Sequence, residues 1–88
     1  MIRIVVVDDH AVVRSGLKML LNDKHDMEVV GEASDGEEGI REAELLHPDV
    51  VLMDLSMPHG MDGLTATREL KSRMPDVAVL ILTMHDDD

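Results

Sequence analysis

Residues 50–63, VVLMDLSMPHGMDG, join a short apolar run to one carboxylate and then to a turn. The four apolar residues that open this segment are typical of a buried strand. The strand ends at Asp54, and the turn around Pro58 can continue neither a strand nor a helix. A helix can begin after Asp62, because aspartate is a favoured N-cap residue. The segment therefore predicts that Asp54 lies at the carboxyl end of a buried strand, the edge at which parallel α/β sheets bind ligands.

Short apolar strands and amphipathic helices alternate along the whole chain. Strands are predicted at residues 2–7, 27–33, 50–53 and 77–82. Helices are predicted at about residues 10–22, from a capping box at 34–37 to about 46, and at 63–73. This order is typical of an α/β fold with a parallel sheet and right-handed crossovers.

Length and composition limit the protein to one domain of ordinary globular character. The 88 residues are 44% apolar and contain no cysteine and no aromatic residue, which excludes a disulfide and a thiolate metal site. No apolar run is long enough to span a bilayer, and no signal peptide is recognisable, so we expect a cytoplasmic protein without membrane contact. The net charge of −11 argues against direct binding of nucleic acid or anionic lipid by this chain.

Oxygen-bearing side chains follow three of the predicted strands. Asp8 and Asp9 follow the first, Asp54 follows the third and Thr83 follows the fourth. Because the carboxyl ends of parallel strands share one edge, we expect these residues to meet there. Converging carboxylates repel one another, and Mg²⁺, which prefers oxygen ligands, would remove that repulsion. Asp54 is the best candidate for a nucleophile that forms an acyl phosphate, and the Thr83 hydroxyl could bond a phosphoryl oxygen.

Simpler interpretations exist for each of these residues taken singly. An aspartate after a strand is commonly a helix N-cap, and Asp9 could be only that. His10, His59 and His85 could join the aspartates in a transition-metal site, but His59 is more simply a loop residue, and His10 and His85 match the segments of the family resemblance described below. The acid pair after the first strand, combined with the single Asp54 after the third, makes a functional site the stronger interpretation.

Three segments together resemble the receiver domain of bacterial two-component response regulators: VVVDDH (5–10), VVLMDLSMP with GMDG (50–58 and 60–63) and VLILT (79–83). The segments DDH with VRSGL (8–10 and 13–17) and LTMHD (82–86) are similar to the LuxR-type regulators. The resemblance covers the whole chain. It implies a flavodoxin-like, CheY-like sheet of order 2-1-3-4, and a regulatory module, not an enzyme, that controls a C-terminal DNA-binding output domain absent from this chain.

The resemblance also implies a role for each site residue. Asp54 would accept a phosphoryl group from a sensor histidine kinase, and Thr83 would be the switch hydroxyl. Mg²⁺ would be bound directly by Asp9, Asp54 and the backbone carbonyl of Ser56, and more indirectly by Asp8. His59 and Gly60 together make the loop beside Asp54 one residue longer than the family pattern.

The chain also departs from the family pattern in length. Over residues 1–88 it lacks the family's fourth helix, fifth strand with its active-site lysine, and fifth helix, so we expect an incomplete receiver. Metal binding should then be weakened and phosphoryl transfer impaired. We also expect self-association as a homo-oligomer through the exposed fourth strand. The alternative function is therefore an inactive, self-associating assembly fragment. A phosphohydrolase is a weaker alternative, because no general acid is evident.

Overall fold

The computed structural model describes residues 1–57 and 61–82, in which strands and helices alternate as the sequence predicts. The strands are β1 (Ile2–Val7), β2 (Met27–Ala33), β3 (Val50–Asp54) and β4 (Ala78–Leu82). The helices are α1 (Ala11–Asn22), α2 (Gly36–Leu46) and α3 (Gly63–Arg73). Two strand bounds differ from expectation by one residue, because Asp54 belongs to β3 and β4 begins at Ala78. Helix α1 also begins one residue later than expected, at Ala11.

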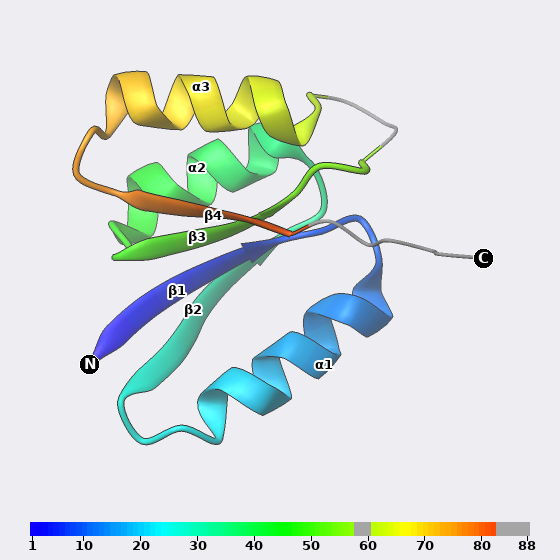
Figure 1. The fold of residues 1–88 in the computed structure, drawn as a ribbon, viewed down its shortest axis with the longest axis vertical. Coiled ribbons are helices and arrows are strands. Elements are labelled where there is room, and N and C mark those ends of the chain that lie inside the picture. The colour runs from blue at the N-terminus through cyan, green and yellow to red at the C-terminus, as the bar shows by residue number, and fades with distance from the viewer. Residues whose placement is uncertain (58–60, 83–88) are drawn as a thin grey trace.

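The four strands form one parallel sheet in the order β2-β1-β3-β4, which confirms the predicted order. β1 lies between β2 and β3, and its last residue, Val7, is paired with Ala33 on one side and Met53 on the other. The chain therefore leaves β1 and β3 at the same level of the same edge (Figure 1). This register determines where the residues that follow the two strands lie.

The helices form two unequal layers on the sheet. Helices α2 and α3 cover one face, and α1 lies on the other (Figure 1). Val5, Val7, Met53 and Leu70 are among the fully buried side chains of the core under α2 and α3. The smaller core on the other side centres on four strand residues, with parts of α1 packed against it, and α1 itself has no fully buried residue.

The N-termini of α2 and α3 are capped by aspartates. For α2 the predicted capping box was wrong by one residue, because Asp35 and not Ser34 is the N-cap and accepts a hydrogen bond from the Glu38 backbone N–H (2.9 Å). The Glu38 carboxylate in turn accepts from the Ser34 backbone N–H (2.8 Å). For α3 the predicted N-cap is confirmed: Asp62 accepts from the Thr65 N–H at 2.7 Å.

None of the three helices in the described part of the chain has the length and apolar character needed to cross a bilayer.

Candidate acidic site at the carboxyl edge of the sheet

The structure brings Asp8, Asp9 and Asp54 together at the edge where β1 and β3 end. Val7 and Met53 are paired neighbours in the two parallel strands, so the next residue of each strand, Asp8 and Asp54, also adjoin. Both are 1% exposed, which is unusual for carboxylates. With His10, the three aspartates offer ligand atoms that all lie within 4.8 Å of one another. Buried acids so close together need a positive partner, because burial disfavours an isolated charge.

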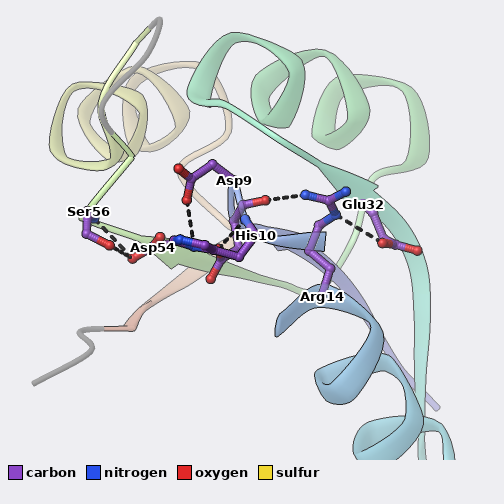
Figure 2. Close-up of polar contacts among 7 residues, drawn as sticks. Asp9, His10, Arg14, Glu32, Asp54 and Ser56 are labelled. Atoms are coloured by element: carbon purple, nitrogen blue, oxygen red, sulfur yellow. Dashed lines mark hydrogen bonds and ion pairs between the residues drawn. The ribbon is translucent and has the colours of Figure 1, made fainter. Parts of the chain in front are cut away.

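His10 lies directly beside the acid pair (Figure 2). Its Nδ1 atom is 3.1 Å from Asp8 Oδ1 and 2.9 Å from Asp9 Oδ1. The hydrogen bond to Asp8 and the negative charge of Asp9 raise the pKa of His10 above its ordinary value, and Asp54 adds a smaller effect. The neighbouring carboxylates therefore favour a positive charge on the imidazole at this edge.

The carboxylate of Asp54 is held on one side only. Its Oδ1 atom accepts hydrogen bonds from the Ser56 backbone N–H (3.0 Å) and the Ser56 hydroxyl (2.8 Å) (Figure 2). Its Oδ2 atom is buried and has no hydrogen-bond partner among the described residues. The sequence interpretation gave Ser56 only a backbone role and missed this hydroxyl bond, although a serine two residues after an aspartate is close enough to bond it.

A second buried oxygen, Asp9 Oδ1, also lacks a hydrogen-bond partner in the described structure. It is near His10 Nδ1, but the two groups are not aligned for a hydrogen bond. Unpaired buried oxygens are costly, and a hard divalent cation bound between the carboxylates would satisfy them. The residues present therefore fit a Mg²⁺ ion.

Arg14 of α1 bonds the backbone of the acid pair, a role that was not predicted from the sequence. Its Nη1 donates to the backbone carbonyl of Asp8 at 2.6 Å, and its Nε donates to Glu32 of β2 at 3.2 Å (Figure 2). Lys18, one turn further along α1, reaches the same glutamate at 3.5 Å. Helical spacing places Arg14 one turn after His10, but nothing in the sequence links it to Glu32.

The alternative interpretation of Asp9 as a helix N-cap is wrong. The N-cap of α1 is His10, and no side chain caps that helix. Asp8 does have a local structural role, because its Oδ1 accepts from the His10 backbone N–H at 2.8 Å. Thr83, the loop residues His59 and Gly60, and His85 lie outside the described residues, so their expected places stay predictions.

Known proteins are similar to this chain over almost its whole length. Residues 4–88 match the family model described as the response regulator receiver domain. The oxygen regulatory protein NreC of Staphylococcus carnosus is 52% identical over 86 residues, which are 98% of this chain and 40% of that protein. The chain thus spans well under half the length of this curated relative.

Two solved structures extend the comparison. A LuxR-family response regulator from Aurantimonas sp. SI85-9A1 is 40% identical, with a TM-score of 0.90 over 98% of this chain and 61% of that one. RcsB from Salmonella enterica serovar Typhimurium, bound to promoter rprA in the presence of the phosphomimetic BeF3⁻, is 30% identical. Its TM-score is 0.86 over 99% of this chain and 72% of that one.

Proposed function

We propose a function from the premise that this chain belongs to the family of response regulator receiver domains. In this proposal Asp54 accepts a phosphoryl group from a sensor histidine kinase. The observation that carries it is the buried Asp54 carboxylate at the end of β3, with one unpartnered oxygen, beside Asp8 and Asp9. The proposed Mg²⁺ ligands are Asp8, Asp9, Asp54 and the backbone carbonyl of Ser56, and Thr83 is the proposed switch hydroxyl.

The phosphoryl step needs a fixed carboxylate and positive charge to stabilise the phosphoryl oxygens. A carboxylate oxygen of Asp54 attacks the phosphorus of a phosphohistidine; the new P–O bond forms as the P–N bond breaks, and its electron pair leaves with the imidazole nitrogen. Ser56 orients the carboxylate through two hydrogen bonds to Oδ1. A bound Mg²⁺ ion would offset the charge on the phosphoryl oxygens. Asp8 and Asp9 would hold that ion beside the nucleophile.

The output of the phosphorylated receiver follows from its relatives by analogy. RcsB was solved on promoter DNA together with a phosphomimetic, and NreC is named as a regulatory protein. We infer that this receiver likewise controls a DNA-binding domain of its parent protein, in the cytoplasm. The charge of −11 favours a regulatory and not a DNA-contacting role for residues 1–88 themselves.

Mg²⁺-dependent labelling by acetyl phosphate, followed by intact mass, tests the proposal. We expect the mass of one phosphoryl group to be added to the wild-type chain and to Asp76→Asn, but not to Asp54→Asn. Asp76 is a suitable control because it precedes β4 and so lies at the opposite edge of the sheet. Wild type that binds Mg²⁺ but is not labelled would contradict the role of Asp54. Labelling of Asp54→Asn would show that another residue accepts the phosphoryl group.

Labelling of the 88-residue chain should be slow and incomplete. None of the lysine contacts in the described part of the chain reaches the acidic site: Lys18 bonds Glu32, and Lys71 bonds backbone carbonyls near the start of β4. A phosphoryl group on Asp54 would therefore lack a lysine partner among those residues. Fast and complete labelling would show that Mg²⁺ and the backbone suffice.

A second function, self-association, is favoured by the exposed side chains of β4. Leu80 and Ile81 are 57% and 42% exposed, and within the described residues β4 pairs only with β3. An apolar strand with an unpaired edge is a template for another chain. Light scattering over a concentration series should give a dimer for wild type and for Leu64→Lys, a control on α3, but a monomer for Leu80→Lys. A wild-type monomer at every concentration would exclude this function.

A further inference from the structure

We propose that His10 is a metal ligand in the acidic site, so that the site binds first-row transition-metal ions such as Ni²⁺ and Co²⁺ through one nitrogen and several carboxylate oxygens. The inference rests on the metal site of the proposed function and adds a nitrogen donor to it. It needs no phosphorylation, so it can be tested on metal binding alone.

The spacing of the ligand atoms carries the argument. In an octahedral site with metal–ligand bonds of about 2.1 Å, adjacent ligand atoms lie about 3.0 Å apart. His10 Nδ1 is 3.1 Å from Asp8 Oδ1 and 2.9 Å from Asp9 Oδ1. These separations are those of neighbouring ligands around one ion. An ion can therefore be bound with only small movements of the three side chains.

The unpartnered buried oxygens of the site point independently to a bound cation. Asp54 is 1% exposed and its Oδ2 has no hydrogen-bond partner in the described structure, and the same holds for the buried Oδ1 of Asp9. Both residues belong to the group whose ligand atoms lie within 4.8 Å of one another, and His10 is a member of that group. A cation that satisfied the two oxygens would therefore lie close to the imidazole.

The backbone of His10 prepares the side chain for this role. His10 is the N-cap of α1 with an extended backbone (φ −99°, ψ 111°), yet its side chain makes no capping hydrogen bond. Its backbone N–H is fixed by Asp8 Oδ1 at 2.8 Å, which holds the residue over the acid pair. The side chain is 60% exposed, so a hydrated ion can approach it without unfolding the edge.

A nitrogen ligand changes which metals the site prefers. Mg²⁺ takes oxygen ligands and gains little from imidazole, whereas imidazole is a preferred ligand of Ni²⁺, Cu²⁺ and Zn²⁺. The competing explanation is that His10 is only a positive counter-ion for the aspartates. A counter-ion must leave before any cation binds, so removing it would strengthen the binding of every divalent ion. A ligand behaves differently, because its loss weakens only the metals that use nitrogen.

Calorimetric titration of Ni²⁺ and Mg²⁺ into wild type and His10→Ala distinguishes a metal ligand from a counter-ion. The buffer should be mildly alkaline so that imidazole is neutral. We expect His10→Ala to lose Ni²⁺ affinity by about tenfold or more, a loss comparable to that seen when supporting residues of metal sites are removed. Its Mg²⁺ affinity should be unchanged or higher. Equal changes for both ions, or unchanged Ni²⁺ affinity, would overturn the proposal.

Three control variants keep the result specific to His10. His25→Ala removes an exposed histidine that lies between α1 and β2, and it should bind Ni²⁺ as wild type does. His59→Ala and His85→Ala test the two histidines outside the described residues, and a loss of Ni²⁺ affinity there that exceeds the loss in His10→Ala would move the nitrogen ligand to them. The visible spectrum of bound Co²⁺ gives a second readout, which should change in His10→Ala. If Mg²⁺ fails to bind wild type at all, the proposed function fails instead.

Discussion

The Arg14 guanidinium connects the acidic site to β2 through two hydrogen bonds. One goes to the Asp8 carbonyl (2.6 Å) and the other to Glu32 (3.2 Å), and the side chain is mostly buried. Because the peptide of Asp8 leads directly into Asp9, this contact restrains the loop that carries both aspartates. We therefore regard Arg14 as a positioning residue for the acid pair.

Arg14→Ala should destabilise the fold by about 1–3 kcal/mol, because it leaves a partly buried carbonyl without its charged donor. It should also weaken Mg²⁺ binding, since the loop gains freedom that binding must remove. Urea unfolding and Mg²⁺ titration measure the two effects. Lys18→Ala is the matched control, as Lys18 pairs with the same Glu32 at 3.5 Å, whereas the hydrogen bond to the Asp8 carbonyl comes from Arg14. Equal effects in the two variants would show that only the charge on Glu32 matters.

The sequence predicted some of the site residues and missed others for a physical reason. Asp8 and Asp54 follow apolar strands, and the parallel order alone brings strand ends to one edge. The bonds of Arg14 and the Ser56 hydroxyl depend on rotamers and on the path of α1 over the sheet. Hydrophobic periodicity contains no information about either.

Helix α3 begins against the backbone of β3. A Cβ atom added to Gly63 would overlap the carbonyl oxygen of Asp54, and backbone cannot move aside as a flexible side chain can. Gly63→Ala should therefore destabilise the protein by about 1–3 kcal/mol and displace Asp54. Gly16→Ala in α1 is the control, because nothing lies within 4 Å and the change should stabilise the helix by about 0.5–1 kcal/mol. Thermal unfolding of both variants checks the contrast; similar melting temperatures would contradict it.

The N-cap of α3 makes stability depend on pH. The hydrogen bond from the Thr65 N–H lowers the pKa of Asp62, so the folded state favours the carboxylate. This contribution is present above the ordinary pKa of aspartate and is lost as the pH falls through the lowered value. Asp62→Ala should have a lower melting temperature than wild type at neutral pH, and this difference in melting temperature should become smaller in acid. Asparagine can cap the helix but does not titrate, so the difference in melting temperature between Asp62→Asn and Asp62→Ala should not change with pH.

The cap of α2 shows why sequence alone misplaced one helix start. Ser34 and Asp35 are both favoured N-cap residues, and each has a glutamate three residues later. Two overlapping capping boxes therefore fit the sequence equally well. The structure selects Asp35, because Gly36 then begins the helix in tight contact with the Met61 backbone, where no side chain fits.

The molecule as a whole is stabilised mainly by the layer under α2 and α3. Leu70 of α3 is fully buried there, whereas Leu21 of α1 is only partly buried in the smaller core. Leu70→Ala should cost about 2–5 kcal/mol, a large part of the roughly 5–15 kcal/mol that a small domain has. Leu21→Ala should cost clearly less. Denaturant unfolding with unchanged slopes would measure the loss of unfolding free energy in both variants. Equal losses would show that α1 stabilises the fold as much as α3.

The sheet order was predictable only in part from periodicity. Alternating strands and helices predict a parallel sheet, but several orders satisfy right-handed crossovers. The order β2-β1-β3-β4 came from the resemblance to a family, because no local pattern states which strands are neighbours.

The central place of β1 has a consequence for how the protein is made on the ribosome. β1 leaves the exit tunnel first, and β2 and then β3 pair with it on either side, while β4 pairs with β3. Each of the three later strands thus finds a neighbour already synthesised. A domain generally folds as a unit, so strand pairing can begin once β2 has followed β1, but the sheet is completed only when β4 has emerged. Of the four strands, only β1 emerges before any of its partners has been translated.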